Sequence, residues 1–424
     1  MLGAIVKAWP LLLGIFMLMI GNGLQGTVLG VRGGAEGFSD TTLGYIMAGY
    51  FVGFLGGSRA TPWLLRRVGH VRVFAALASL ISAAFVLYAS LPHPAAWFLL
   101  RLMVGFCFSG VYICAESWLN DTATNETRGQ TMSAYIIAQM LGIILAQGLL
   151  NVADPGGYDL FVIMSVLVSI SFAPILLSST PVPVFQTTRA MTLGRLYETS
   201  PLGCVSIFIL GAVFACQFGM SAVYAAGLGL SNAQISLFIG TIYLGGLLCQ
   251  PPIGWLSDRM DRRRLIIIMT GVGALSCLVV PVFGASAATL VIAGFLMGGV
   301  ANPLYSLVVA YVNDYLEHED MPAASAGLIM LNGIGAMGAP VLVGLLMDTI
   351  AQSAFFLFLS ACFSAITIYA VWRMRQRPVR VVVGEVAPCV PMSQVVSPIA
   401  ADVARDAAIE QAREADRREP VAAG

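Results

Sequence analysis

The amino-acid sequence contains twelve long, continuously apolar stretches separated by short polar segments. A helix needs about 20 such residues to cross the roughly 30 Å hydrocarbon core of a bilayer. The pattern disfavours a membrane β-barrel, whose strands alternate between apolar and polar residues, because these stretches are continuously apolar. The sequence therefore predicts an all-α membrane protein with twelve transmembrane helices. The predicted spans are 8–30, 41–63, 71–91, 95–119, 129–151, 159–179, 203–226, 232–256, 264–284, 287–312, 324–347 and 352–373.

Composition excludes most classes of water-soluble protein. Only 10% of the 424 residues are charged, whereas a soluble domain carries about 25%. The formal charge is zero, from 22 basic and 22 acidic residues. The chain therefore lacks the basic excess with which a protein binds nucleic acid. The lipid bilayer is its predicted solvent.

The sequence contains no recognisable catalytic or metal-binding pattern. We find no P-loop, no H-E-x-x-H and no G-x-S-x-G. The three histidines, His70, His93 and His318, all fall in predicted loops, and the eight cysteines form no C-x-x-C pair. We therefore expect no enzyme activity, no metal or other cofactor, and no nucleotide as an energy source.

The basic residues between the spans fall mainly on one side of the predicted membrane. With the N-terminus inside, the inner segments hold most of these residues and the outer loops hold only Arg32. Cytoplasmic loops of membrane proteins carry such an excess of Lys and Arg. We therefore predict a multi-pass protein of a bacterial inner membrane, with both termini in the cytoplasm.

An internal repeat relates the two parts of the chain. At an offset of 193 residues, Tyr112 falls on Tyr305, and Asn120-Asp121 falls on Asn313-Asp314. Duplicated sets of helices with a site between them are typical of transporters. The predicted fold is therefore two pseudo-symmetric six-helix halves. The predicted organisation is a first half at 1–180, a cytoplasmic linker at 181–202, a second half at 203–373 and a polar cytoplasmic tail at 374–424.

A charged loop between the eighth and ninth spans carries a family signature. Residues 254–263 read G-W-L-S-D-R-M-D-R-R, which resembles the loop G-x-x-x-D-R-x-G-R-R of the major facilitator superfamily. Arg101-x-x-x-Gly105 resembles the intramembrane arginine motif of that family, and Arg128 lies where the family has an inner-loop arginine. The resemblance implies the major facilitator fold and a secondary transporter that works by alternating access.

The segments 116–120, 125–129 and 252–259 are together similar to the YcaD-like subgroup of the superfamily. The two halves depart from the family pattern in different ways. Arg66 takes the place of the acidic loop residue in the first half. In the second half, Asp261 replaces the second glycine of the loop, and Gly294 replaces the intramembrane arginine. The charged residues of the family motifs are therefore distributed unequally between the two halves.

Two charged residues lie in the fourth predicted span. Arg101 is about two turns inside it, where a charge costs about 2.5–3.5 kcal/mol on insertion scales. We favour a cavity role in substrate or proton coupling over a structural arginine bound to helix-end carbonyls. Glu116 lies about 22 Å further along the helix axis, so the two side chains cannot touch. Glu116 is either a protonatable or gating group near the cytoplasmic mouth, or a fixed salt-bridge partner of the inner arginines.

Uncharged polar residues mark the rest of the predicted pathway. Gln25 meets Gln217 under the repeat, and Gln139 meets Asn332, as expected for a central site between the halves. The alternative is interhelical hydrogen bonding, worth about 0.6 kcal/mol for each bond. Asn302-Pro303 also predicts a helix break, because proline removes a backbone hydrogen bond. The predicted substrate and proton pathway consists of Asn22, Gln25, Arg101, Tyr112, Glu116, Gln139, Gln217, Tyr224, Asn302, Tyr305 and Asn332.

Charged residues at the cytoplasmic helix ends form a predicted gate. We expect each half to tie its own loop to its own helix end, with Arg66 or Arg67 paired to Asp121 and Arg262 or Arg263 paired to Asp314. The alternative is an arginine cluster that only sets the topology. The predicted gate consists of Arg66, Arg67, Asp121, Arg128, Gly254, Asp258, Arg259, Asp261, Arg262, Arg263 and Asp314.

These patterns and the resemblance predict a secondary active transporter that moves a small solute across the inner membrane. We expect transport to be coupled to protons rather than to sodium, because one arginine and one glutamate suit a proton, whereas sodium needs a cluster of oxygen ligands. We expect export rather than uptake. The alternatives are an uptake symporter or uniporter of the same fold, and a non-transporting sensor or assembly factor on this scaffold. The expected partners are a small-molecule substrate, protons and the bilayer, without nucleic acid or nucleotide, and the chain is expected to be a monomer.

Overall fold

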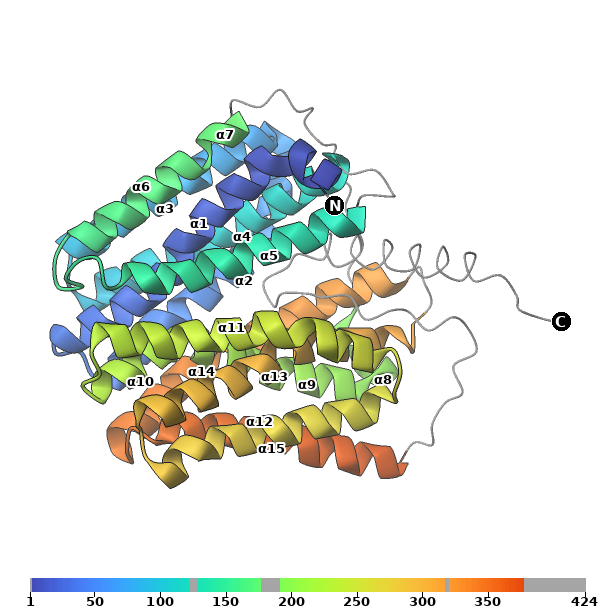
Figure 1. The fold of residues 1–424 in the computed structure, drawn as a ribbon. Coiled ribbons are helices and arrows are strands. Elements are labelled where there is room, and N and C mark those ends of the chain that lie inside the picture. Colours follow the sequence, from blue (N-terminus) through green and yellow to red (C-terminus); the bar gives the residue numbers. More distant parts are fainter. Residues whose placement is uncertain (1, 123–127, 177–190, 317–319, 377–424) are drawn as a thin grey trace.

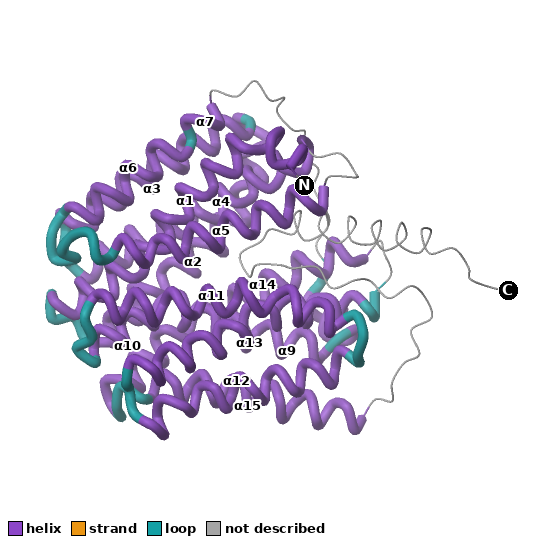
Figure 2. The backbone as a smooth tube through the Cα atoms, viewed as in Figure 1, coloured by secondary structure: helices purple, strands orange, loops and turns teal. Residues whose placement is uncertain are grey.

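Helices make up nearly all of the structure, and the described residues contain no strand (Figure 1). The computed structural model describes residues 2–122, 128–176, 191–316 and 320–376. The helices run roughly along one direction, and the short loops gather at their ends (Figure 2). The all-α fold predicted from the sequence is therefore confirmed.

Each predicted span corresponds to helical structure whose ends lie within a few residues of the prediction. The first six spans correspond to α1 (Leu2–Ala35), α2 (Asp40–Val68), α3 (His70–Ser90), α4 (Pro94–Thr122), α5 (Arg128–Leu149), and α6 (Asp159–Ser171) with α7 (Ala173–Leu176). The short α8 (Leu193–Thr199) lies within the predicted linker. The last six correspond to α9 (Pro201–Ala215) with the π-helical η1 (Cys216–Met220) and α10 (Ser221–Gly227), then α11 (Asn232–Ser257), α12 (Arg262–Phe283), α13 (Ala287–Asn313), α14 (Met321–Thr349) and α15 (Ala354–Gln376).

Ten helices in the described residues are long and apolar enough to cross a membrane. The two other predicted spans differ for separate reasons. The helix α2 is long enough, but it includes four charged residues and five glycines. The helix α6 has only 13 residues, because the chain leaves regular helix at Phe172 before α7 begins. Of the predicted tail, only residues up to Gln376 are described, and they extend α15.

The two halves repeat the same helix pairings. In the first half α2 packs on α4, α1 on α5 and α3 on α6. In the second half α11 packs on α13, α9 on α14 and α12 on α15, which are the equivalent pairs under the repeat. Figure 1 shows the halves as two bundles, one blue to green and the other green to red. The predicted pseudo-symmetric arrangement is thus the observed one.

Close approach of two backbones explains why glycine recurs at equivalent positions of the fourth and tenth spans. A Cβ atom at Gly105 would lie 2.0 Å from the carbonyl oxygen of Tyr50. At Gly298, its repeat mate, a Cβ atom would lie 1.9 Å from the carbonyl oxygen of Ile242. Small residues allow such packing where lipid supplies no hydrophobic drive between helices. Each half is therefore clamped by the same helix crossing.

Repeated caps also set where α2 and α11 begin. Ser39 accepts a hydrogen bond from the backbone of Thr42, and Ser231 accepts one from the backbone of Gln234. Such side-chain caps satisfy N–H groups that lack a partner in the first helical turn. The equivalent start of two helices is therefore encoded locally in both halves.

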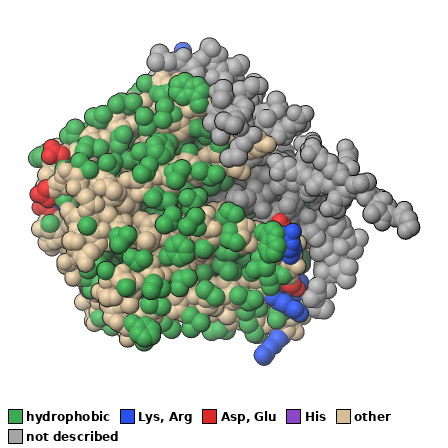
Figure 3. Space-filling view, in the orientation of Figure 1, with side chains coloured by type: hydrophobic (Ala, Val, Ile, Leu, Met, Phe, Trp, Pro, Cys, Tyr) green, Lys and Arg blue, Asp and Glu red, His purple; other side chains and the backbone are tan. Residues whose placement is uncertain are grey.

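The surface around the helices is apolar. Figure 3 shows hydrophobic side chains over the lateral face, with charged side chains near the two ends. Large side chains such as Leu275, Phe283 and Ile368 are 68%, 75% and 70% exposed, which suits contact with lipid tails. We call the end that holds the start of α1 and the last turn of α15 the terminal end, and the opposite end the distal end.

Candidate functional site

Arg101 lies on α4 at the interface between the two halves and is fully buried. Its guanidinium carbon is 5.0 Å from the ring centre of Tyr50 on α2 and 5.7 Å from that of Phe218 on η1. Its Nη2 donates to the sulfur of Met47 at 3.4 Å. These are aromatic and thioether contacts rather than helix-end carbonyls. The role of Arg101 in binding or proton coupling stays a prediction.

Several polar atoms around Arg101 have no hydrogen-bond partner among the described residues. They are fully buried, although an unpaired buried polar group costs about 1–3 kcal/mol. Such groups in native structures need an explanation, and a polar ligand is one. The atoms on the predicted pathway are Gln25 Oε1, Arg101 Nε, Arg101 Nη1 and Gln217 Nε2.

A chain of hydrogen bonds joins three of the predicted residues. Gln25 Nε2 donates to Asn22 Oδ1 at 2.7 Å, and Asn22 Nδ2 donates to the Tyr112 hydroxyl at 3.0 Å. Gln25 neighbours Gly26, where a Cβ atom would lie 3.6 Å from Arg101 Nη2. The structure therefore brings α1 and α4 together at Arg101 through polar side chains.

Glu116 lies further along α4 towards the terminal end and is also fully buried. Its Oε1 accepts a hydrogen bond from the Tyr135 hydroxyl of α5 at 3.0 Å. Gln139 lies one turn beyond Tyr135 on the same helix and interacts with its hydroxyl. Glu116 thus lies between two helices of the first half, towards the end where the sequence predicts the cytoplasmic mouth.

The π-helical turn η1 of the second half packs on α1 and α2 of the first. Gln217 is 4% exposed, and its neighbour Phe218 covers the guanidinium of Arg101. Single π-helical turns inside α-helices occur frequently at functional sites. Arg101 is therefore contacted from both halves.

The other predicted residues of the second half are not joined to this cluster by hydrogen bonds. Tyr224 stacks on Phe355 with ring centres 5.0 Å apart. Asn332 donates to the carbonyl of Ile207 at 3.3 Å, as in the interhelical alternative. Tyr305 is 2% exposed. Tyr224 and Asn332 thus contact residues of their own half.

The predicted helix break at Asn302-Pro303 is wrong. The helix α13 continues through this dipeptide from Ala287 to Asn313. Asn302 Nδ2 donates to the carbonyl of Gly298 at 3.2 Å, which supplies a side-chain hydrogen bond beside the proline. Neighbouring helices and side chains commonly satisfy the backbone around proline in membrane proteins.

A latch at the distal end joins the halves. The carboxylate of Asp348 on α14 accepts from the backbone N–H groups of Asp40 at 3.1 Å and Thr41 at 2.8 Å. It also accepts from the Thr41 hydroxyl at 2.6 Å, and Gln352 Nε2 donates to Asp40 Oδ2 at 2.6 Å. An aspartate of one half thus caps the first turn of a helix in the other. No sequence pattern predicts this contact.

We expect Asp348→Asn to raise access from the distal end. Hydrogen bonds to a charged group contribute about 1.5–3 kcal/mol, so their loss shifts a balanced two-state equilibrium several-fold or more. The readout is thiol labelling of a cysteine introduced at Ser221, which is 1% exposed. Asp154→Asn is the matched control, because Asp154 contacts only its own loop through Gly156. Equal labelling of both variants would show that Asp348 does not hold the distal end closed.

The predicted gate pair of the second half is present at the terminal end. Arg262 is 6% exposed, forms an ion pair with Asp314 and donates to the carbonyl of Ala310 at 3.0 Å. Asp258 lies 3.6 Å from the same guanidinium. These contacts tie the loop after α11 to the end of α13.

The remaining charged residues of this loop have local contacts. Asp261 caps α12 by accepting from the backbone of Arg263 at 2.8 Å. Arg263 donates to the Tyr315 hydroxyl at 2.5 Å, and Arg259 lies over the ring of Trp255 at 4.1 Å. Gly254 belongs to the last turn of α11. The loop is therefore held by contacts within its own half.

The first half has a different arrangement. Arg66 and Arg67 are exposed, and Arg67 lies over the ring of Trp63 at 5.3 Å. The side chains of Asp121 and Arg128 lie outside the described residues, so the pair predicted for this half stays a prediction. The assignment of His70 to a loop is wrong, because it begins α3 and is 2% exposed.

Asp314 gives this end a dependence on pH. Burial raises its pKa to about 6 from an ordinary value of 3.8, although Arg262 lowers it and Asp258 and Asp261 raise it. The folded protein therefore binds a proton at this carboxyl more readily than an unfolded chain does. Its contribution to stability is present at about pH 4 and is lost as the pH rises through about 6.

We expect the melting temperature to fall between pH 5 and pH 7 in part through Asp314. Asp314→Asn removes this titration, so the fall becomes smaller in the variant. Asp154→Asn is the control, because Asp154 lies in a loop of the first half, where it accepts from the backbone of Gly156. The melting temperatures of the unmodified protein, the Asp314 variant and the control are measured at pH 5 and at pH 7. An unchanged fall in Asp314→Asn would contradict the assignment.

Comparison with known proteins identifies the family to which this chain belongs. The sequence profile described as "Major Facilitator Superfamily" matches residues 11–201 and 202–411. The "Uncharacterized MFS-type transporter YcaD" of Salmonella arizonae is 24% identical over 358 residues, which cover 83% of this chain and 91% of that protein. The protein of the same name from Salmonella dublin is 23% identical over the same shares.

Two solved structures share the fold. A mutant of the nucleoside transporter NupG aligns with a TM-score of 0.74 at 12% identity, covering 86% of this chain and 99% of that chain. The structure titled nucleoside transporter NupG aligns with a TM-score of 0.69 at 13% identity, covering 88% and 99%. At such identities the likeness concerns the fold alone.

Proposed function

Since this chain belongs to the major facilitator superfamily of membrane transporters, we propose that it moves a small solute by alternating access around Arg101. The solute binds between α1 and α4 of the first half and η1 of the second. The buried polar atoms of Gln25, Arg101 and Gln217 without partners carry the proposal. A binding site for a polar solute needs such groups, because donors and acceptors that are already hydrogen-bonded within the protein cannot bind the solute.

The charge at Arg101 favours a solute with an anionic group. A guanidinium presents five N–H donors in a planar fork that matches carboxylate and phosphate. Two of its nitrogen atoms lack a partner among the described residues. The rings of Tyr50 and Phe218 beside it suit an apolar or aromatic part of the same molecule. We therefore propose a small organic anion as the substrate class.

We propose further that protons drive the transport and that Glu116 carries them. Glu116 is fully buried, its Oε1 accepts from the Tyr135 hydroxyl, and a carboxyl group can take up and release a proton. Glu116 is separate from Arg101 along α4, so proton and solute have distinct positions. Export in exchange for protons is the direction we expect, with the terminal end in the cytoplasm of a bacterial cell.

A ligand screen followed by flux tests the proposal. Purified protein is scanned for thermal stabilisation by small carboxylates, organic phosphates and nucleosides, the last because NupG is a nucleoside transporter. The strongest ligand is then followed in proteoliposomes, with and without an imposed pH gradient. We expect an organic anion to bind and its flux to follow the gradient.

The alternatives give different outcomes in the same assay. Flux with the opposite response to the gradient would indicate an uptake symporter, and flux without any response a uniporter. Binding without flux would indicate a sensor or an assembly factor on the transporter scaffold. Selective binding of neutral solutes would contradict the proposed substrate class.

A further inference from the structure

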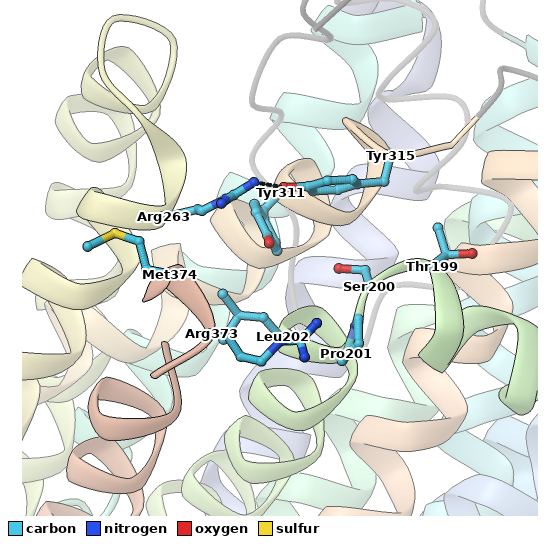
Figure 4. Close-up of a pocket in the computed structure, with 9 residues that line it drawn as sticks. All are labelled: Thr199, Ser200, Pro201, Leu202, Arg263, Tyr311, Tyr315, Arg373 and Met374. Atoms are coloured by element: carbon cyan, nitrogen blue, oxygen red, sulfur yellow. Dashed lines mark hydrogen bonds between the residues drawn. The ribbon is translucent and has the colours of Figure 1, made fainter. Parts of the chain in front are cut away.

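A small cavity opens at the terminal end of the second half, away from Arg101 (Figure 4). Four helices and the residues before α9 surround it. Its described lining contains two arginines, four hydroxyl-bearing residues and no carboxylate. The lining residues are Thr199, Ser200, Pro201, Leu202, Arg263, Tyr311, Tyr315, Arg373 and Met374.

The start of α9 faces this cavity with an unused cap. Ser200 precedes the helix, and its side chain makes no capping hydrogen bond. The residue is 2% exposed, and its Oγ has no partner among the described residues. Figure 4 shows this hydroxyl pointing into the space beside Tyr311. A helix N-terminus with a free hydroxyl donor is a favourable place for an anion.

Two arginine side chains line the same cavity. Arg263 is 8% exposed and donates to the Tyr315 hydroxyl across the cavity. Arg373 reaches from the last turn of α15 towards the first turn of α9 (Figure 4). Two positive charges, a hydroxyl donor and a helix N-terminus at one cavity form a site for a phosphate group.

The surroundings place this cavity at the level of lipid headgroups. Trp372, next to Arg373, is 50% exposed, and Tyr197 on α8 is 51% exposed. The exposed tryptophans Trp63 and Trp255 lie at the same end, each beside an arginine. Tryptophan and tyrosine concentrate at membrane interfaces. Basic pockets between transmembrane helices at that depth bind anionic headgroups.

We propose that this cavity binds the phosphate of an anionic phospholipid from the leaflet at the terminal end. The phosphodiester accepts from Arg263, Arg373 and Ser200, and the acyl chains run along the apolar outer face of α15. The bound lipid ties α9 and α15 to α13, whose end holds the Arg262–Asp314 pair.

Lipid binding to the purified full-length protein in neutral detergent tests this proposal. The probes are dioleoyl phosphatidylglycerol and dioleoyl phosphatidylcholine, with bound lipid counted by native mass spectrometry and stability followed by thermal unfolding. We expect at least one phosphatidylglycerol to be retained in preference to phosphatidylcholine, and to raise the melting temperature. Glycerol 1-phosphate, added without acyl chains, distinguishes a lipid site from a site for a soluble phosphate.

The variants are Arg373→Gln and Ser200→Ala, with Arg375→Gln as the control. Arg375 is exposed on the same helix end and does not line the cavity. We expect about tenfold weaker phosphatidylglycerol binding in Arg373→Gln, a smaller loss in Ser200→Ala, and no change in the control. The proposal is overturned if phosphatidylcholine binds equally well, if Arg375→Gln has the same effect as Arg373→Gln, or if glycerol 1-phosphate stabilises the protein as strongly as the lipid.

Discussion

Replacement of Arg101 by alanine is expected to abolish transport while the protein still folds. The guanidinium is buried between Tyr50 and Phe218, and two of its nitrogen atoms have no partner among the described residues. Folding therefore loses few hydrogen bonds when the side chain is removed. A bound anion would lose its charged partner, worth about 1.5–3 kcal/mol, so we expect flux to fall by about 100-fold. Flux in proteoliposomes and thermal unfolding are measured on the same preparations.

Arg32 supplies the matched control for this experiment. It is also buried, at 6% exposure, but it donates to the carbonyls of Gly157 at 2.9 Å and Ala89 at 3.4 Å. Arg32→Ala should therefore lower the melting temperature and leave the flux of each folded molecule nearly unchanged. Arg101→Lys should retain only part of the activity, because an ammonium lacks the planar fork and stacks less well on rings. Normal flux in Arg101→Ala would remove this residue from the mechanism.

Glu116→Gln is expected to separate transport from the pH gradient. The variant retains the shape of the side chain and a partner for the Tyr135 hydroxyl, but it cannot take up or release a proton. Exchange of substrate across the membrane should continue, whereas accumulation driven by an imposed gradient should vanish. Flux driven by a pH gradient, compared with exchange at equal pH, provides the measurement.

Tyr135→Phe tests whether Glu116 acts through its proton rather than its packing. The variant removes the hydrogen bond at 3.0 Å and leaves the carboxyl able to titrate. We expect coupling to survive with an altered pH profile. If Glu116→Gln keeps the full response to the gradient, the residue has a structural role and protons cross elsewhere.

The membrane fold was predictable because lipid restricts the secondary structures that can span a bilayer. Every spanning segment must satisfy its own backbone, so helices appear as long apolar stretches in the sequence. The repeat was visible because the same crossings need the same small residues, as Gly105 and Gly298 show. The ends of two helices were harder to predict. The glycines and charged residues of α2 weaken its apolar pattern, and α6 is interrupted at Phe172.

Charged and amide residues inside spans were also informative. Arg101 was found from its charge, and the ion pair of Arg262 with Asp314 followed from the repeat and the short loop. Gln25 was found because polar residues inside lipid are rare. These residues carry a cost that only a partner, a cavity or a ligand can offset.

Other parts of the site had no sequence signal. The π-helical turn at 216–220 has the same apolar composition as an α-helix, so nothing in the sequence marks Phe218 as a cover for Arg101. Tyr135 looks like any helical aromatic residue until α5 packs against Glu116. Asp348 meets Thr41 across 307 residues of sequence, a pairing that follows from tertiary packing alone.

Locking the distal end closed tests alternating access most directly. Asn151 Nδ2 donates to Ser236 Oγ at 3.0 Å across the two halves, so a short crosslinker that forms a disulfide with each thiol can join cysteines at these positions. The double variant Asn151→Cys, Ser236→Cys is placed in proteoliposomes with the ligand found in the screen, and flux is measured after crosslinking and again after reduction. We expect crosslinking to stop flux and reduction to restore it, while each single variant transports throughout. Full flux through the crosslinked double variant would contradict the claim that solute crosses by alternating access between the halves.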